Sequence, residues 1–345
     1  MDSHAIVGVC KEMCPIKEYN FRKKHNLIHI LEKTQDGHVD RSLCIKEFRR
    51  SAAGENLSNA NVLRSGNVLL KTAKYLISQI AFSKSSTPVD IYEFVFDRLR
   101  SIRQDMVIQQ LVHTDQETAL EIFSICCRYY IYIDFKTKFS AENFKIDKHI
   151  HTTHLHDCLN SFVRIAFKAN TLSEYSVEII YSYLLLNLDS EQNLMNVLKN
   201  CPEILRKNKL FSSVVELCLL MNTKHNFYRM ILVYKNIYEH CSTFTKILLC
   251  LSLVKVRTMF LATLCKSHSS KTFNFPLEML QSWLFLSDLN STIYFCNKHG
   301  LSCNEEKVNL IKSNFDNLGM FYCKSCPIFK QLNNVDVCFK KVVSP

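Results

Sequence analysis

The sequence predicts a mainly α-helical protein, a right-handed solenoid of helical hairpins that ends in a small winged-helix module. The 345 residues are 47% hydrophobic, enough to bury one large core or two medium ones. Six glycines and six prolines are too few for the many tight turns of a sandwich or barrel. The glycine-rich phosphate loops of many doubly wound α/β folds do not occur. Apolar residues instead recur at helical spacing between capping residues.

The N-terminal segment is predicted to combine irregular and helical stretches. Residues 1–14 show no helical period, whereas Pro15 and Glu18 suit the first turn of a helix. That helix should end near Gly37. A short second helix is expected over 42–54, because its first residue is a serine that can cap the start and its last a glycine that can end it.

Longer helices are predicted to follow. One lies within 61–82, and another covers 89–112, where the apolar positions keep a helical period. Thr114, with Glu117 three residues later, matches a capping box for a helix over 115–135. Further predicted helices cover 144–168, 173–187, 190–199, 203–207, 210–221, 226–239 and 243–264.

The spacing of these helices resembles stacked hairpins, so residues 15–270 are predicted to form the solenoid. No stretch reaches the self-similarity of a tetratricopeptide (TPR) repeat. Residues 179–188 are apolar but too few to span a membrane, and 247–265 carry Lys255 and Arg257 at their centre, where charge is costly. Both stretches are therefore predicted as core helices, with no membrane association.

The composition changes at 265–276, a polar stretch that ends in proline and makes the best domain joint. After it the sequence predicts short helices at 277–286 and 289–299, then a strand, a turn and a strand within 301–311, and a further extended segment at 320–332. Short helices followed by a small sheet favour a winged-helix module. We assign it to 271–332 and regard 333–345 as a tail.

The net charge indicates which binding partners suit the protein, and the cysteines indicate the cellular compartment. The formal net charge is +11, from 43 Lys and Arg against 32 Asp and Glu, which suits nucleic acid or an acidic protein but also fits an ordinary basic protein. The start of the chain lacks the basic and apolar regions of a signal peptide. Seven of the sixteen cysteines lie in apolar stretches that are predicted to be helical and are expected to be free thiols of a protein from the nucleus or cytosol: Cys126, Cys127, Cys158, Cys218, Cys250, Cys265 and Cys296.

Two cysteine pairs raise the alternatives of zinc or redox chemistry. Cys10 and Cys14 are four residues apart, whereas structural zinc and redox pairs favour CxxC, so a packing role with Arg22 paired to an acid is preferred. Histidines near this pair are His4, His25 and His29. Cys323 and Cys326 form a true CxxC, but the cysteines that would complete a zinc ribbon are distant: Cys303 and Cys338.

A histidine-rich stretch at 149–157 is a weaker metal candidate. On a helix, His151 and His154 share one face, while His149 and His156 share another. No HExxH glutamate accompanies them, so solvated histidines are favoured. Neither a metal nor a cofactor is predicted. The sequence also lacks GxSxG, kinase and phosphate-loop signatures, which favours a non-enzymatic protein.

Several motifs occur in one order along the chain. A pattern Gly-x-Cys-x-x-Met-Cys-Pro, followed by Glu and Arg, is carried by Gly8, Cys10, Met13, Cys14, Pro15, Glu18 and Arg22. A second is carried by Ile45, Lys46, Phe48, Arg50, Ser51 and Ala52, and a third by Asp97, Arg98, Arg100, Arg103, Gln104, Asp105 and Gln109. Two more are carried by Glu174, Tyr175, Leu184, Leu185, Leu186, Asn187 and Leu188, and by Asn226, Phe227 and Arg229.

Over about residues 8–315 these motifs resemble the GANP (germinal-centre-associated nuclear protein) and yeast suppressor-of-actin family, and its short single-domain members most. One departure is that Ser65 follows Arg64 where the family commonly has proline. The resemblance implies a PCI-type helical scaffold that ends in a winged helix, pairs with a PCI-domain protein and a small acidic subunit, and binds RNA or other nucleic acid. It also implies a place in messenger-RNA export at the nuclear pore. A centrosomal or mitotic-spindle adaptor that acts through protein contacts alone is the alternative.

Two sets of candidate residues follow. The family motifs suggest structural roles for Gly8, Cys10, Cys14, Pro15, Glu18, Arg22, Arg50, Asp97, Arg98, Arg103 and Asp105. Arg98, Arg100 and Arg103 could contact RNA, but their mixing with Asp97 and Asp105 favours ion pairs that lock neighbouring helices. Nucleic-acid contacts are instead expected from Lys298, His299, Lys307, Lys312, Lys324 and Lys330, with a solvated wing as the alternative.

Overall fold

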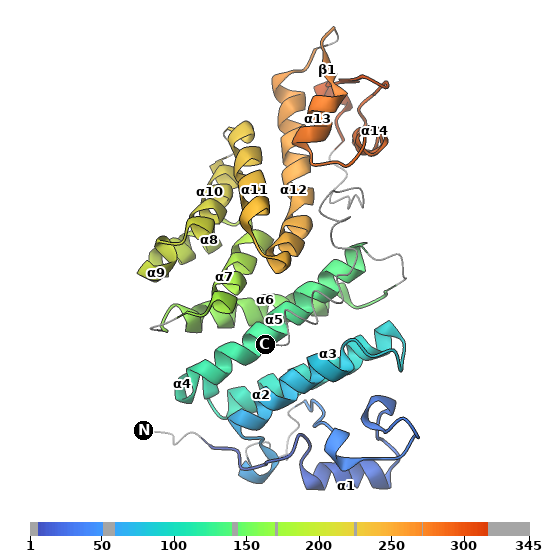
Figure 1. Ribbon diagram of the computed structural model, residues 1–345, viewed down its shortest axis with the longest axis vertical. Coiled ribbons are helices and arrows are strands. Elements are labelled where there is room, and N and C mark those ends of the chain that lie inside the picture. Colours follow the sequence, from blue (N-terminus) through green and yellow to red (C-terminus); the bar gives the residue numbers. More distant parts are fainter. Residues whose placement is uncertain are drawn as a thin grey trace. The chain divides into compact units, whose positions relative to one another are not determined.

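Helices make up most of the computed structural model (Figure 1), which confirms the predicted helical class. The structure describes residues 6–50, 59–139, 144–169, 172–223, 226–270 and 272–316. It divides into two compact units, one ending at Ile179 and the other beginning at Ile180. We describe each unit by itself. The joint expected at 265–276 lies within the second unit.

The first helix of the N-terminal unit, α1 (Ile16–Lys24), begins directly after Pro15 as predicted. It ends well before Gly37, because Asn26 adopts a left-handed conformation with φ of 55°. The amide of Leu27 then donates to the carbonyl of Arg22 at 2.8 Å, a bond that closes a helix at its C-terminus. The prediction of one helix up to Gly37 is therefore wrong.

The helix expected over 42–54 is also not formed in the part that is described. A 3₁₀ turn at Arg41–Leu43 leads into extended chain up to residue 50, and 51–58 lie outside the described residues. Cys44, Ile45 and Lys46 are consecutive and all buried. A surface helix buries only a stripe, so three adjacent buried side chains do not fit a helix on the surface.

Four longer helices form the centre of this unit: α2 (Gly66–Tyr75), α3 (Pro88–Ile108), α5 (Gln116–Phe139) and α6 (Lys148–Ala166). α2 contacts both α3 and α5, and α5 contacts α6, as the ribbon shows (Figure 1). A π-helical turn (Leu76–Ile80) extends α2, and the short α4 (Leu111–Thr114) precedes α5. The carboxylate of Asp115, rather than Thr114, caps α5 by accepting from the amide of Thr118 at 3.1 Å.

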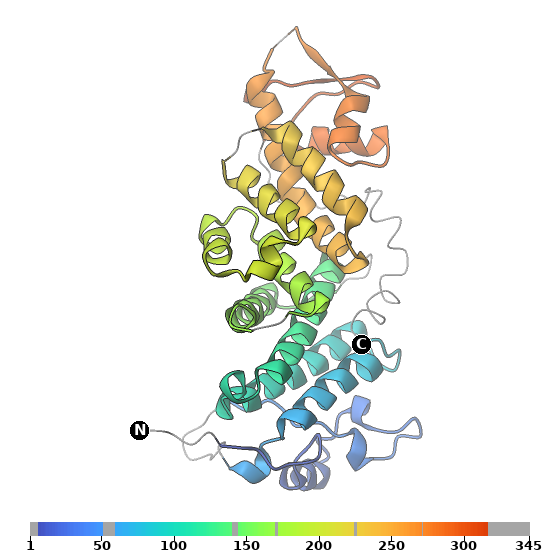
Figure 2. The same cartoon turned by 60° about the vertical axis from the view of Figure 1, so that its left-hand side comes forward.

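The helices of the second unit begin at their predicted places. α7 (Glu174–Leu186) contains the division between the units, and the helices after it are α8 (Glu191–Asn200), α9 (Glu203–Arg206), α10 (Lys209–Thr223), α11 (Phe227–His240) and α12 (Thr243–Ser267). α10 packs against α11 and α11 against α12, and both views show α10 and α11 side by side (Figure 2). All seven cysteines expected in apolar helices are buried, and none of them is in a disulfide in the described part of the chain.

α12 is long and apolar enough to cross a membrane by length and composition, and 72% of its most apolar window is buried inside the protein. Arg257 at its centre is buried as well. The guanidinium donates to the carbonyl oxygens of Leu284 and Phe285. Arg257, whose charge makes a membrane-spanning segment unfavourable, thus holds the chain after α13 (Leu277–Trp283) against α12.

The described C-terminal part is ordered as β1 (Asn274–Pro276), α13, α14 (Leu289–Lys298) and β2 (Lys307–Asn309). The two strands pair antiparallel, with Phe275 opposite Val308. The sequence indicated both helices and an extended stretch at 301–311 but missed β1, which lies in the polar joint next to a proline. The expected segment at 320–332 and the tail at 333–345 lie outside the described residues.

Candidate functional site

The motif residues of the N-terminal unit converge on one face of α3. Arg98, Ser101 and Asp105 follow one another at three- and four-residue steps, so they point in one direction from the helix, and all three are buried. Arg100 and Arg103 are likewise three residues apart, but they lie on a different face. The helical period therefore separates the arginines of a single motif into two groups.

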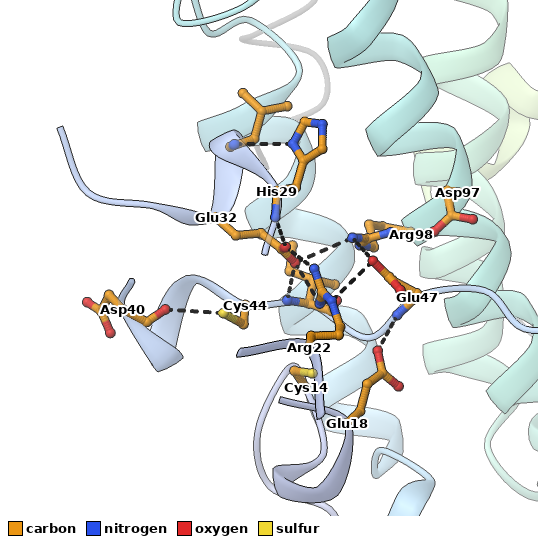
Figure 3. Close-up of polar contacts among 12 residues, drawn as sticks. Cys14, Glu18, Arg22, His29, Glu32, Asp40, Cys44, Glu47, Asp97 and Arg98 are labelled. Atoms are coloured by element: carbon orange, nitrogen blue, oxygen red, sulfur yellow. Dashed lines mark hydrogen bonds and ion pairs between the residues drawn. The ribbon is translucent and has the colours of Figure 1, made fainter. Parts of the chain in front are cut away.

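The first group centres on Arg22 of α1 and Glu32, ten residues later (Figure 3). The Arg22 guanidinium donates Nη1 to Oε1 of Glu32 at 3.2 Å and Nη2 to the other carboxylate oxygen, and it also donates to the carbonyl of Ile45 at 3.0 Å. The two charged side chains are 1% and 0% exposed. The prediction that Arg22 pairs with an acid is confirmed, and a two-bond geometry of this kind orients both partners.

Arg98 joins this pair to α3 (Figure 3). Its Nη2 lies 3.5 Å from Oε1 of Glu32 and 3.1 Å from Oε1 of Glu47, and Nη1 donates to Asp97 at 2.5 Å. The guanidinium also lies over the ring of Phe94, 4.4 Å from its centroid. The ion pair predicted for Arg98 and Asp97 is thus present, together with two carboxylates from the segment before residue 50.

The second group centres on Asp105. One carboxylate oxygen accepts from Nε of Arg64 at 2.8 Å, and the other accepts from Nζ of Lys46 at 2.7 Å. Arg64 also donates Nη2 to the hydroxyl of Ser101 at 2.9 Å. The Arg64 and Asp105 side chains are both 0% exposed. Asp105 therefore pairs with cations from two other segments and not with an arginine of its own helix.

The extended stretch at 44–48 passes between the two groups. The amide of Ile45 donates to Glu32 at 2.9 Å, that of Glu47 to Glu18 at 2.8 Å, and that of Phe48 to Asp97 at 3.2 Å. Carboxylates from distant segments thus satisfy backbone donors that a helix would have satisfied internally. This is the physical reason why the described part of the predicted helix, residues 44–50, is not helical.

Gly8 shows why the motif begins with a glycine. Its amide donates to Oε1 of Gln109 at 2.8 Å, and Gln109 in turn donates to the carbonyl of Arg64 at 2.9 Å. A Cβ atom on Gly8 would lie 2.6 Å from the carbonyl oxygen of Leu63. Only a residue without a side chain allows this approach, which sets the N-terminal segment beside Arg64.

We use the name buried charge network for this set: Glu18, Arg22, Glu32, Lys46, Glu47, Arg64, Asp97, Arg98 and Asp105. The sequence identified Glu18, Arg22, Asp97, Arg98 and Asp105 and missed the others as site residues. Glu32 and Lys46 could have been suspected from one signal, since each is a charged residue directly beside buried apolar ones, Leu31 and Ile45.

Burial determines the chemistry of the thiols and acids around the network. Desolvation, followed by the charge of Glu18, raises the pKa of the Cys14 thiol, and desolvation raises the pKa of Cys44 to about 11. Burial also raises the pKa of Glu18. Protonated thiols are poor nucleophiles and poor metal ligands. No group of three potential metal ligands occurs among the described residues, and Cys323 and Cys326 lie outside them.

Two other predicted residues lie apart from the network. Arg50 is exposed, and Arg103 donates to Nδ1 of His154 at 3.0 Å instead of pairing with Asp105. The prediction of solvated histidines holds for His149, which is exposed, and is wrong for His151, which is buried. Nε2 of His151 donates to the carbonyl of Tyr130 at 3.1 Å, so its Nδ1 accepts from the hydroxyl of Tyr92 at 3.2 Å.

The lysines proposed for nucleic acid belong to the second unit. Lys298, Lys307 and Lys312 are exposed. His299 is 0% exposed, and its Nδ1 contacts the carbonyl of Asp316 at 3.0 Å, so we leave it out of the contact set. Lys324 and Lys330 lie outside the described residues.

Fold and site together define a mainly α-helical protein in which N-terminal sequence motifs build a buried charge network against α3. Residues 13–305 match the profile of the SAC3/GANP family, and the chain belongs to that family. The resemblance drawn from the motifs is thereby confirmed.

Three curated relatives show how local the similarity is. The chain is 36% identical over 104 residues to SAC3 family protein 1 of Schizosaccharomyces pombe and 31% identical over 119 residues to SAC3 family protein B of Arabidopsis thaliana. It is 29% identical over 158 residues to Protein xmas of Drosophila melanogaster. These alignments cover 30%, 34% and 41% of this chain but only 10%, 7% and 8% of the relatives. The chain thus corresponds to a small part of much longer proteins.

Proposed function

We propose that the protein is a non-enzymatic scaffold subunit in nuclear messenger-RNA export, which acts with transcription-coupled export factors at the nuclear pore. Membership of the SAC3/GANP family over residues 13–305 is the observation that carries this proposal. In this proposal the helices form a PCI-type solenoid. The scaffold binds a PCI-domain protein and a small acidic subunit, and the complex binds nucleic acid.

The buried charge network supports the scaffold role. The side chains of Arg22, Glu32, Arg64 and Asp105 are at most 1% exposed and pair with one another or with Lys46 and Arg98, so its centre is closed to a substrate. These ion pairs tie Glu32, Lys46 and Arg64, which are far apart in sequence, to one face of α3. A partly buried ionic network of this kind favours one arrangement of the chain over others. We assign it the role of holding the N-terminal segment in one shape.

The C-terminal part supports the nucleic-acid role. The order β1, α13, α14, β2 has the helices and the antiparallel pair that a winged-helix module contains. Lys298, Lys307 and Lys312 are exposed on it, and lysines of this kind bind phosphates in a salt-dependent, sequence-tolerant manner. The net charge of +11 adds long-range attraction for a polyanion.

The proposal is tested by purifying the tagged full chain from nuclear extract, with and without nuclease, and identifying bound proteins by mass spectrometry. We expect a PCI-domain protein and a small acidic subunit that stay bound after nuclease treatment. Recovery of tubulin or centrosomal proteins without them would contradict the export role and favour the adaptor alternative. Glu32→Gln, which leaves the buried charges of Arg22 and Arg98 without this counter-ion, serves as the destabilised control.

A further inference from the structure

The second face of α3 carries arginines that the buried charge network does not use. Arg98 has three carboxylates within reach, at 2.5, 3.1 and 3.5 Å. Arg100 and Arg103, two and five residues further along, form no ion pair with any residue that the structure describes. Both are half-buried, and the exposed Arg50 lies close enough to Arg100 for their charges to repel. One helix therefore holds an ion-paired arginine, Arg98, on one face and, among the described residues, two arginines without an ion pair on the other.

Arg100 is held by an aromatic ring and not by an acid. Its guanidinium carbon lies 3.9 Å from the centroid of the Phe48 ring. Phe48 is fixed in turn, because its amide donates to Asp97 and the side chain of Gln104 donates to the carbonyl of Arg49. Burial and the charges of Arg103 and Arg50 lower the pKa of Arg100, a sign that positive charge here is not neutralised. A guanidinium stacked on a ring keeps its N–H groups free in its own plane.

Arg103 is oriented by a neutral histidine. Its Nη2 donates to Nδ1 of His154 at 3.0 Å, so that nitrogen carries no proton, and burial with the charges of Arg103 and Arg100 lowers the pKa of His154 to about 4. The guanidinium also faces the Tyr130 ring at 5.9 Å and the Cys158 thiol, while its buried Nε finds no partner among the described residues. The groups that raise the pKa of Arg103 are Tyr130, Cys158 and Cys126 and, after them, Asp157, which forms no ion pair with it.

We infer that Arg50, Arg100 and Arg103 form an oxyanion site that binds the phosphodiester backbone of single-stranded RNA. Uncompensated, half-buried guanidinium groups bind an oxyanion more strongly than solvated lysines do, and their forked N–H groups match the oxygens of a phosphate. The Phe48 ring beside Arg100 adds a surface on which a base can stack, as in single-strand binding proteins. The site extends the proposed nucleic-acid role to residues of the N-terminal unit and does not depend on the C-terminal lysines.

The test uses the full chain and a fluorescein-labelled oligouridine, with binding measured by fluorescence anisotropy across a series of salt concentrations. Replacing Arg100 and Arg103 by Gln removes two contacts, and each contact to a single strand contributes about 0.7 to the slope of log K against log salt. We therefore expect the slope to fall by about 1.4 in R100Q/R103Q, and by about 0.7 in R50Q, whose exposed side chain can be replaced without disturbing the fold. The charge-matched control is K17Q/K71Q, which removes two exposed lysines of α1 and α2 and should keep the original slope.

Three further measurements distinguish this arginine site from other surfaces of the protein and from a different ligand. K298Q/K307Q/K312Q tests the C-terminal lysines. If this variant lowers the slope of log K against log salt while R100Q/R103Q and R50Q leave it unchanged, the arginine site is wrong and the proposed function stays intact. Stronger competition by a polyglutamate peptide than by unlabelled oligouridine of the same charge would overturn it in favour of an acidic protein. Ultraviolet cross-linking of the wild-type chain to the RNA should label Phe48 or its neighbours, and labels confined to the second unit would contradict the site.

Discussion

Asp105 and Arg64 form an ion pair at 2.8 Å with both side chains fully shielded from solvent. The two residues come from α3 and from the segment before α2, and Lys46 reaches the other oxygen of the same carboxylate. One aspartate thus balances two buried cations, so its loss would leave both without this counter-ion.

Replacing Asp105 by Asn should destabilise the protein by about 3–5 kcal/mol, because Arg64 and Lys46 would keep their charges without a counter-ion. The free energy of unfolding is measured by urea denaturation of the full chain. The control is Asp157→Asn, an exposed acid on α6, which should change it by less than about 0.5 kcal/mol. Equal effects of the two substitutions would mean that the Asp105 pairs do not stabilise the fold.

Replacing Gly8 by Ala should cost about 1–3 kcal/mol, since the new methyl group would lie 2.6 Å from the Leu63 carbonyl oxygen and 2.8 Å from Oε1 of Gln109. Gly66→Ala is the matched control. Its Cβ would make ordinary contacts of 3.4 Å or more at the start of α2, so it should be neutral or stabilising by up to about 1 kcal/mol. Thermal denaturation of both variants distinguishes a local clash from a general intolerance of glycine replacement.

Glu18 offers a test of charge against hydrogen bonding. Burial raises its pKa, so the folded state holds the proton more tightly than the unfolded state does. Its contribution to stability is therefore present below the unfolded pKa of about 4.3 and is lost as the pH rises through the higher folded value. Glu18→Gln keeps an oxygen for the Glu47 amide and should leave stability at neutral pH unchanged or raise it. Glu18→Ala removes the acceptor and should cost about 1–3 kcal/mol. If Glu18→Gln and Glu18→Ala lower the free energy of unfolding equally in urea denaturation, the hydrogen bond to the Glu47 amide does not stabilise the fold.

His154 should make the protein less stable in mild acid. Its pKa in the folded state is about 4, below the unfolded value of about 6.5, so the unfolded state binds more protons between these limits. Stability is thus fully present above about pH 6.5 and is lost progressively as the pH falls towards 4. His29 and His151, whose pKa values are also lowered by burial, contribute in the same direction.

The measurement is the free energy of unfolding across this pH range for wild type, His154→Asn and His149→Asn. Asn can still accept a hydrogen bond from Arg103 but does not titrate. The free energy of unfolding of His154→Asn should therefore fall less steeply than that of wild type as the pH falls. Because His149 is exposed, His149→Asn should have the same pH profile as wild type. Parallel profiles for all three proteins would show that His154 does not cause the loss of stability in mild acid.

Much of this protein could be determined from the sequence alone. The helices after residue 60 lie within a few residues of their predicted ranges, because apolar periodicity and capping residues are local signals. The family followed from motifs in order, and the pairing of Arg22 with an acid followed from the expectation that a buried arginine needs a counter-charge.

Only the tertiary structure decided the N-terminal segment and the division of the arginines. The stretch at 44–48 has a helix-like composition, but its amides are satisfied by Glu18, Glu32 and Asp97, which lie up to 49 residues away. No local pattern encodes such bonds. The same holds for Arg98 and Arg100, which are two residues apart in one motif. A helix turns about 200° over two residues, so one guanidinium meets the buried carboxylates and the other meets the Phe48 ring.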